Sequence, residues 1–331
     1  MSPDAISRDD GAETVFLGID GGGTKTAVAI INAKAELVGS GSAGASNINV
    51  CGAATATKSF QHAIAEAVTA LPPGTRAGGV WAAVAGAGQP AQQRRVQRIL
   101  RRVLRTQPLG NRSGLGQAPL RVTDDACAVL AASDLSEGIV VIVGTGSFVW
   151  GQRHDGVSAR AGGWGYLLGD PGGGFDLGRR AVVAVLSESD GFGPSTALTP
   201  LLLDRFAIPR PLDLIPLVYA GAEGRARLAS LGEVVLSLVG QGDPVARGIV
   251  DHAASELAQQ IIAVATSLHT SDVSIICSGS IARHPVMEDA LHRSVSPFLR
   301  VHWQLPLRTP AEGAATLART LAIAGETVIG A

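Results

Sequence analysis

The sequence predicts an α/β protein with a mixed sheet in each of two halves. Strands in a meander are followed by alternating helices and strands. The order strand, glycine turn, strand, turn, strand also occurs twice, once around Gly21 and again around Gly144. An internal repeat of this kind is typical of a duplicated domain. A chain of 331 residues is long for one hydrophobic core and sufficient for two domains.

The first half should contain five strands and three helices. Apolar runs bounded by turn residues predict strands at 15–20, 26–32, 35–41, 79–85 and 120–123. Apolar residues at helical spacing predict helices at 58–71 and 92–105, and a short helix at 126–133. Residues 107–119, which are rich in glycine and polar residues, predict a loop.

The second half repeats the strand meander and then becomes mainly helical. Strands are predicted at 139–143, 148–152, 157–161, 273–277 and 301–304. Helices are predicted at 176–187, 213–220, 226–240, 244–269 and 312–324, with one more after Gly279. We therefore expect a tail at 1–12, an N-terminal domain at 13–125 and a C-terminal domain at 126–331, whose last helix can pack back on the N-terminal domain.

Composition points away from nucleic-acid and membrane partners. Lys and Arg number 27 against 28 Asp and Glu, so no global charge favours a polyanion. No apolar run reaches the ~18 residues that a membrane helix needs. The three cysteines are far apart and include no CxxC pair, so neither zinc nor a disulfide framework is indicated. A cytoplasmic enzyme or binding protein is the simplest interpretation.

The first glycine turn, Gly21-Gly22-Gly23-Thr24, follows an apolar strand that ends in Asp20. A P-loop would require lysine where Thr24 stands and a helix after it, yet residues 27–31 are apolar and favour a strand. We predict a hairpin turn that offers backbone N–H groups and the Thr24 hydroxyl to phosphate, with Asp20 holding Mg²⁺ through water. The alternative is an ordinary flexible turn. The GxGxxG at 39–44 lacks a following helix, and we interpret it as a loop.

Three other segments combine turn residues with reactive side chains. Gly144-Thr145-Gly146-Ser147 repeats the first turn, so the pair could clamp a polyphosphate from two sides. Asp124 and Asp125 end a strand, where either is a helix cap or one is a base that accepts a hydroxyl proton. The loop 162–174 carries Trp164, Tyr166 and Asp170 among glycines, which is typical of a small polar ligand site. The six arginines of the helix at 92–105 are interpreted as a solvated face rather than a nucleic-acid patch.

Five motifs together resemble the N-acetylglucosamine kinase and glucosamine kinase family. They are GIDGGGTKT, TDDA, VGTGS, GGWGYLLGDPGGG and ICSGSIA, in that order, and the resemblance extends from about residue 15 to 325. That family belongs to the BadF/BadG/BcrA/BcrD-type ATPases of the actin-like ATPase superfamily. The resemblance implies two ribonuclease-H-like domains with mixed sheets flanked by helices, an active-site cleft between them, and a homodimer.

The resemblance also implies an activity and roles for individual residues. ATP with Mg²⁺ would phosphorylate an amino sugar, most simply N-acetylglucosamine at its 6-hydroxyl, with Asp125 as the general base and Asp20 on the metal side. Phosphate contacts are implied for Gly21, Gly22, Gly23, Thr24, Gly144, Thr145 and Gly146, adenosine contacts for Gly279, Ser280 and Arg283, and sugar contacts for Asn47, Ser147, Gly163, Trp164, Gly165 and Asp170.

Two departures from the family pattern leave the sugar open. Phe148 stands where some N-acetylglucosamine kinases have asparagine, and Pro171-Gly172-Gly173-Gly174 replaces the commoner acid-Gly-Ser. Glucosamine and other modified amino sugars are therefore alternatives. An ATPase that activates a reductase would need cysteines in a cluster-like context, which Cys51, Cys127 and Cys277 lack. A sugar-responsive regulator would need a DNA-binding domain, for which the residues before the first strand are too few.

Overall fold

The computed structural model describes residues 13–106 and 115–323, so the predicted tail and most of the predicted loop at 107–119 lie outside the described residues. Contacts divide these residues into two units. The first unit comprises the chain up to Leu135 together with the segment from Pro306, and the second comprises Ser136–Leu305. Each unit is described by itself below.

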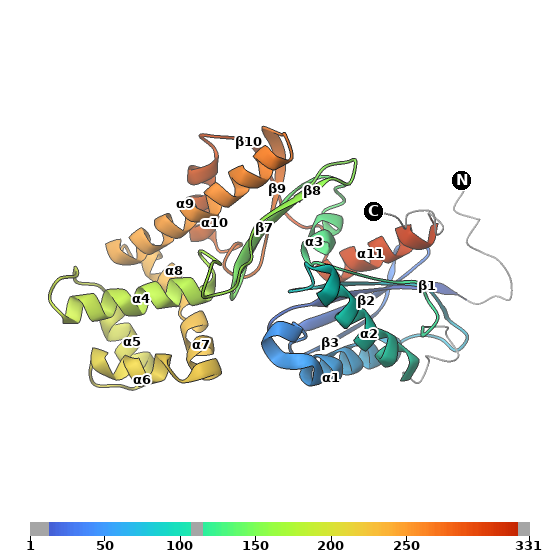
Figure 1. Ribbon diagram of the computed structural model, residues 1–331, viewed down its shortest axis with the longest axis horizontal. Coiled ribbons are helices and arrows are strands. Elements are labelled where there is room, and N and C mark those ends of the chain that lie inside the picture. The colour runs from blue at the N-terminus through green and yellow to red at the C-terminus, as the bar shows by residue number, and fades with distance from the viewer. Residues whose placement is uncertain (1–12, 107–114, 324–331) are drawn as a thin grey trace. The chain divides into compact units, whose positions relative to one another are not determined.

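The first unit, which carries the labels β1, β2 and β3 in Figure 1, is built on a five-stranded sheet in the order β3-β2-β1-β4-β5. Its strands are β1 (Thr14–Gly21), β2 (Thr26–Asn32), β3 (Leu37–Ala43), β4 (Arg76–Val84) and β5 (Leu120–Thr123). The first three are antiparallel neighbours, whereas β4 and β5 run parallel to β1. The carboxyl ends of β1, β4 and β5 therefore lie at one edge of the sheet, which places Asp20 near the residues that follow β5.

Alternating residues of β1 supply two different cores. Val15, Leu17 and Ile19 are buried with α1 (Ile48–Val68) and α2 (Pro90–Thr106), whereas Phe16 is buried with α11 (Pro310–Ile323). Gly18 lies on the α11 face, where a Cβ atom would stand 2.0 Å from the Ala311 carbonyl oxygen. A strand with both faces covered must be apolar on both, which explains the uninterrupted apolar run.

The GxGxxG at 39–44 lies largely in strand β3 and serves packing. A Cβ atom at Gly39 or Gly41 would stand 2.5 or 2.2 Å from a carbonyl oxygen of α1. The glycines allow the helix to approach the sheet closely. The prediction that this motif is no dinucleotide site is consistent with that role, although it forms a strand and not the loop that we expected.

The second unit repeats the topology of the first. Its sheet has the order β10-β9-β6-β7-β8, with β6 (Gly138–Val143), β7 (Ser147–Gln152), β8 (Ser158–Gly162), β9 (Asp272–Ser278) and β10 (Arg300–Gln304). Antiparallel pairing joins β6, β7 and β8, and parallel pairing joins β6, β9 and β10. The predicted duplication is thus present strand for strand.

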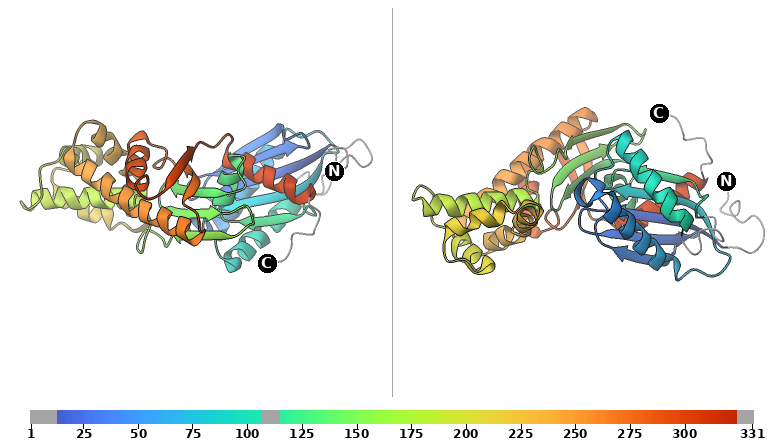
Figure 2. Two further views of the ribbon diagram at one scale, coloured as in Figure 1. Left: turned by 90° about the horizontal axis from the view of Figure 1, so that it is seen from above. Right: turned by 60° about the horizontal axis from the view of Figure 1, so that its bottom comes forward.

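Helices cover this second sheet and extend beyond it. The long α9 (Pro244–Ser267) runs along the strands (Figure 2), and α10 (Pro285–Val295) packs beside α9. The others are α4 (Gly174–Ser189), α5 (Leu198–Phe206), the 3₁₀ turn η2 (Pro211–Asp213), α6 (Leu214–Val218), α7 (Gly221–Ser230) and α8 (Gly232–Gly240).

One helix prediction in this region was wrong, and one helix was not predicted. The helix expected at 226–240 is two helices that break at Leu231, because Gly232 packs directly on the backbone of Gly174. Helix α5 was not predicted, although its proline lies in the first turn, where a helix tolerates it.

The last helix belongs to the first unit. Helix α11 packs on β1, β4 and α3 (Ala126–Ala132), so close that a Cβ atom at Gly313 would stand 2.1 Å from the Ala128 carbonyl oxygen. The contact between α3 and α11 also explains why the contact boundary falls after Leu135 and not after residue 125. Across residues 13–106 and 115–323, no helix combines the length and apolar character needed to span a membrane.

Candidate functional site

The first glycine turn is a hairpin turn between β1 and β2, as predicted. Pairing ends at Gly21 opposite Thr26, and the Gly22 N–H closes the turn by donating to the Lys25 carbonyl over 2.8 Å. The backbone N–H groups of Ser46 and Asn47 both donate to the Gly22 carbonyl over 3.0 Å. The turn is therefore fixed from its base by the segment before α1.

The tip of this turn remains open. Gly23 and Thr24 are exposed, and a Cβ atom at Gly23 would meet nothing within 4 Å. Neither residue forms a hydrogen bond within residues 13–106 and 115–323. Unpaired backbone N–H groups beside a hydroxyl on a fixed turn form a concavity suited to an anion.

Two carboxyl groups from different strands lie near the base of the turn. Asp20 ends β1, and Asp125 follows β5. The Trp81 indole N–H donates to the Thr123 hydroxyl over 2.9 Å, which holds the end of β5 against β4. Asp124 accepts from the Ala126 N–H over 3.1 Å and so caps α3, whereas Asp125 makes no side-chain capping bond. The two adjacent acids thus have different roles.

The Asp125 carboxyl group is buried within this cluster. Its Oδ1 atom is buried and has no hydrogen-bond partner. Burial raises the pKa of Asp125 well above its usual value, and the charges of Asp124 and Asp20 raise it further. Burial also raises the pKa of Asp20 to about 6, while the Lys25 charge lowers it. Lys25, to which the sequence assigned no role, is thus electrostatically coupled to Asp20.

Asn47 lies where the first turn meets α1. Its Oδ1 atom accepts from the Asn49 N–H over 3.0 Å and caps the helix, and the Asn49 amide donates to the Gly86 carbonyl over 3.4 Å. Gly86 has φ +82° and lies against Asn47, where a Cβ atom would stand 2.9 Å from Oδ1. Asn49 was not singled out by sequence, although it shares the cap motif with Asn47.

The second glycine turn joins β6 to β7 in the second unit. The Gly144 N–H donates to the Gly146 carbonyl over 2.9 Å, and no atom would lie within 4 Å of a Cβ at Gly144. The turn is held by the start of α4, because the Gly174 N–H donates to the Gly144 carbonyl over 2.7 Å and the Phe175 N–H to the Thr145 carbonyl over 3.2 Å.

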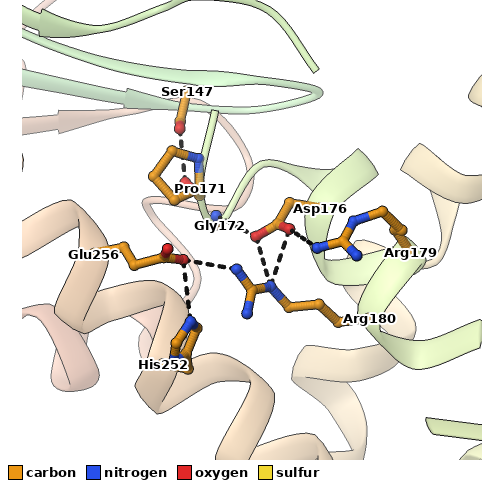
Figure 3. A network of polar contacts seen from close by, with 8 residues as sticks. All are labelled: Ser147, Pro171, Gly172, Asp176, Arg179, Arg180, His252 and Glu256. Atoms are coloured by element: carbon orange, nitrogen blue, oxygen red, sulfur yellow. Dashed lines mark hydrogen bonds and ion pairs between the residues drawn. The ribbon is translucent and has the colours of Figure 1, made fainter. Parts of the chain in front are cut away.

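The predicted sugar-side residues of this unit gather around the second turn. The Ser147 hydroxyl donates to the Pro171 carbonyl over 2.7 Å, as Figure 3 shows. Asp170, with φ +60°, accepts from the Gly165 N–H over 3.1 Å. A Cβ atom at Gly146 would stand 2.3 Å from Asp170 Oδ2, so this carboxylate lies directly on the turn. The turn and the loop form one packed cluster.

An arginine that sequence reasoning missed organises the loop. The Arg160 guanidinium donates to the Gly163 carbonyl over 2.8 Å and stands 5.4 Å and 5.9 Å from the ring centroids of Phe148 and Trp164. Burial raises the pKa of Asp170, and the Arg160 charge lowers it. Trp164 keeps 70% of its surface exposed, so its ring is available to a ligand.

The predicted adenosine residues follow β9. Gly279 has φ +94°, and a Cβ atom there would stand 2.3 Å from the Val143 carbonyl oxygen. The Ile281 N–H donates to the same carbonyl over 3.2 Å. Gly279 therefore lies beside the start of the second turn, and Ser280 and Arg283 follow it on the same segment.

The thiols give no support to a reductase activator. Burial raises the pKa of Cys127 and of Cys277 to about 12. In residues 13–106 and 115–323, no three His, Cys, Asp or Glu side chains group as a metal site would require. This finding leaves room for a metal held by one or two carboxylates and by phosphates.

Comparisons with known proteins agree with the motif resemblance. The family model for the BadF/BadG/BcrA/BcrD ATPase family matches residues 17–318. The chain is 31% identical to the N-acetylmuramic acid/N-acetylglucosamine kinase of Clostridium acetobutylicum, over 78% of this chain and 82% of that protein. It is 26% identical to the N-acetyl-D-glucosamine kinase of Dictyostelium discoideum, over 86% and 91% of the two chains.

A solved structure shows the same fold. The crystal structure of a candidate N-acetylglucosamine kinase from Chromobacterium violaceum matches with a TM-score of 0.69 and 24% identity, over 92% of this chain and 98% of that chain. The predictions of the family, of the two-domain actin-like fold and of an ATP-dependent kinase are therefore confirmed. This chain belongs to the BadF/BadG/BcrA/BcrD ATPase family.

Proposed function

We propose that this protein transfers the γ-phosphoryl group of ATP to an amino sugar, with N-acetylglucosamine and its 6-hydroxyl as the first candidates. The observation that carries the proposal is the buried, unpaired Oδ1 atom of Asp125. A buried acceptor without a donor is costly to fold, and a sugar hydroxyl would supply the missing donor. The names of the relatives from Clostridium acetobutylicum and Dictyostelium discoideum support the sugar class.

Asp125 would act as the general base. Its raised pKa makes its carboxylate a stronger base than an ordinary aspartate, which favours proton transfer from a hydroxyl group. The carboxylate would accept the hydroxyl proton while the sugar oxygen attacks the phosphoryl group. Asp124, which caps α3, would keep Asp125 in place and take no proton from the sugar.

The two glycine turns would bind the phosphates of ATP. The unpaired amides of Gly23 and Thr24 would serve this role in the first unit. The backbone of Gly144, Thr145 and Gly146 would serve it in the second unit, where the Gly144 N–H already donates to the Gly146 carbonyl. Backbone N–H groups that are fixed before the reaction stabilise developing charge without reorganisation. Gly279, Ser280 and Arg283 would border the adenosine, because their segment adjoins the second turn.

Asp20 would hold Mg²⁺. A single partly buried carboxylate at a strand end fits this ion, which keeps several waters and is commonly bound by one or two carboxylates and substrate phosphates. The ion would neutralise charge on the transferred phosphoryl group. Its positive charge would also favour the ionised form of Asp20, whose pKa is otherwise raised to about 6.

The sugar would contact Asn47 in the first unit and Gly163, Trp164, Gly165 and Asp170 in the second. Ser147 would act on the sugar through the loop, because its hydroxyl already donates to the Pro171 carbonyl. Arg160 favours a second candidate, an amino sugar that bears a carboxylate such as N-acetylmuramic acid, since it brings a positive charge into this loop.

A panel of sugars tests the proposal. Glucosamine, N-acetylglucosamine, N-acetylmuramic acid and glucose are each incubated with ATP and Mg²⁺, ADP release is followed, and phosphorus NMR locates the phosphate on the product. We expect turnover with an amino sugar and phosphate on the 6-oxygen. No sugar-dependent ADP release would contradict the proposal, and Arg160→Gln should selectively weaken any activity on the carboxylate-bearing sugar.

A further inference from the structure

The second glycine turn rests on a segment whose own support comes from helices α4 and α9. The turn residues Gly144 and Thr145 accept the backbone N–H groups of Gly174 and Phe175. Gly173 lies so close that a Cβ atom there would stand 2.8 Å from Gly146 Cα. Any displacement of residues 171–175 would therefore displace the turn.

One buried carboxylate fixes this segment. Asp176, in the first turn of α4, is 8% exposed and accepts the Gly172 N–H over 3.1 Å. Gly172 has φ +73°, a conformation that glycine adopts without a steric penalty. The Pro171 carbonyl, one residue earlier, receives the Ser147 hydroxyl. The segment is thus held on one side by the turn and on the other by Asp176.

An arginine continues the chain of contacts to α9. Arg180 donates through Nε to both oxygens of Asp176, over 3.0 and 2.9 Å, and through Nη2 to Glu256 over 2.7 Å (Figure 3). Arg179 donates to Asp176 Oδ1 over 3.0 Å. The Nε2 atom of His252 stands 3.5 Å from Glu256 Oε2. A planar guanidinium that joins two carboxylates defines their separation more strictly than a point charge does.

We propose that Asp176, Arg180 and Glu256 form a positioning brace that holds the second glycine turn in its ligand-binding shape. Asp176 acts on the turn through Gly172, Arg180 orients Asp176, and Glu256 anchors Arg180 to α9. None of the three is assigned to ligand contact. The kinetic part of this inference rests on the proposed function, because it assigns the turn to the phosphates of ATP.

The first measurement does not depend on turnover. Hydrogen exchange of peptides covering 143–147 and 170–176 is compared between the wild-type chain, Asp176→Asn and Glu256→Gln. Asparagine keeps the shape of the side chain but replaces one acceptor oxygen by an NH₂ group and removes the negative charge that pairs with Arg179 and Arg180. We expect exchange of these peptides to rise about 10-fold or more in Asp176→Asn and less in Glu256→Gln, because local opening sets the exchange rate. Wild-type exchange in both variants would overturn the brace.

Arg293→Gln is the matched control. Arg293 donates to Asp251 of α9 over 3.1 Å, so it also joins a helix to α9 by an arginine pair, but it does not contact residues 170–176. Its exchange in the two peptides should stay within about 2-fold of wild type, as for most surface changes. An equal rise in Arg293→Gln would mean that any loosened helix contact reaches the turn, which would also overturn the brace.

The second measurement follows nucleotide binding and kinase kinetics. At metal sites, loss of a group that orients a ligand typically costs about 10- to 100-fold in affinity or activity, and we expect a similar cost here. We expect Asp176→Asn and Arg180→Gln to weaken binding of a non-hydrolysable ATP analogue and to raise KM for ATP by that factor, with partial rescue in Arg180→Lys. A fall in kcat alone, with unchanged nucleotide affinity, would contradict the brace. If the wild-type chain turns over no sugar, the proposed function fails while the exchange result still decides the brace.

Discussion

The two glycine turns occupy equivalent places in the two units but are built differently. The turn at Gly22 is held by the segment before α1 and has two acids, Asp20 and Asp125, at its base. The turn at Gly144 is held by the start of α4 and is packed against Asp170 and the loop around Trp164. The same topology thus carries the perturbed carboxylates in one unit and a braced loop in the other. After a duplication, one copy of the fold can thus carry the reactive side chains while the other copy holds a ligand-binding loop in place.

The largest effect should come from Asp125. Asp125→Asn removes the base while preserving the size of the side chain, and loss of a general base typically costs about 10²- to 10⁴-fold in rate. We expect kcat, measured by sugar-dependent ADP release, to fall by that factor. The nucleotide affinity, measured by calorimetry, should stay unchanged. Asp124→Asn is the matched neighbour and should lose far less activity, because Asp124 caps α3. Equal losses in both variants would contradict the division of roles.

Glycine substitutions should separate packing from ligand binding in both turns. A Cβ atom would clash at Gly21, 2.7 Å from Ser46 Oγ, and at Gly146, 2.3 Å from Asp170 Oδ2, but it would meet open space at Gly23 and Gly144. Alanine at the two crowded positions should cost about 1–3 kcal/mol in the free energy of unfolding.

Alanine at the two open positions should leave stability nearly unchanged and weaken ATP binding, because the added methyl group occupies the space that phosphates would approach. Denaturant unfolding and nucleotide titration of the four variants measure both quantities. Wild-type nucleotide affinity in Gly23→Ala and Gly144→Ala would argue against the phosphate assignment of the turns.

Asp20 should limit stability at neutral pH. Burial raises its pKa to about 6, above its ordinary value of 3.8, so the folded state holds a proton that the unfolded state has released between these values. The resulting destabilisation is absent below the lower value and complete above the higher one. Asp20→Asn should therefore raise the free energy of unfolding by up to about 3 kcal/mol at about pH 8, and by less as the pH falls from about 6 towards 4.

Urea unfolding of Asp20→Asn at several pH values tests this dependence, with Asp204→Asn on an exposed face of α5 as the control. A gain that is independent of pH would show that the carboxyl charge is not its cause. The same substitution should reduce kinase activity, since it removes the acid assigned to Mg²⁺.

The smallest effect concerns Asn47. Its side chain caps α1, so Asn47→Ala should cost about 1 kcal/mol of stability. Asn47→Asp keeps the capping oxygen but loses the amide donor, so it should keep stability and still raise KM for the sugar. Thermal unfolding and sugar-dependent kinetics distinguish the two roles. An unchanged KM for the sugar in Asn47→Asp would show that Asn47 only caps α1 and does not contact the sugar through its amide.

Local patterns were sufficient for most of the fold. The strand at 120–123 and the strand at 26–32 have the predicted bounds, because turn residues delimit short apolar runs on both sides. The predicted duplication rested on the two glycine turns and is present in both sheets. Prediction failed where packing decides: the break at Leu231 depends on Gly232 meeting Gly174, which is distant in sequence.

The site was predictable where a motif carries it and not where distant residues meet. Asp20, Asp125 and the two turns lie at strand ends that the motifs mark. The ion pair between Arg180 and Glu256 joins residues that are 76 positions apart and has no local signal. Arg160 was missed for a different reason, since its role depends on the ring of Phe148 in the neighbouring strand and on the ring of Trp164 in the folded loop after β8.

The most direct test of the account is the fate of the terminal phosphate of ATP. The wild-type protein is incubated with N-acetylglucosamine and Mg²⁺ and with ATP labelled at its γ-phosphate, and sugar phosphate, inorganic phosphate and ADP are separated and counted. The account predicts one sugar phosphate for each ADP, with almost no inorganic phosphate, and loss of both products in Asp125→Asn. Equal amounts of ADP and inorganic phosphate, with no sugar phosphate from any amino sugar, would contradict the account and indicate an ATPase that is not a kinase.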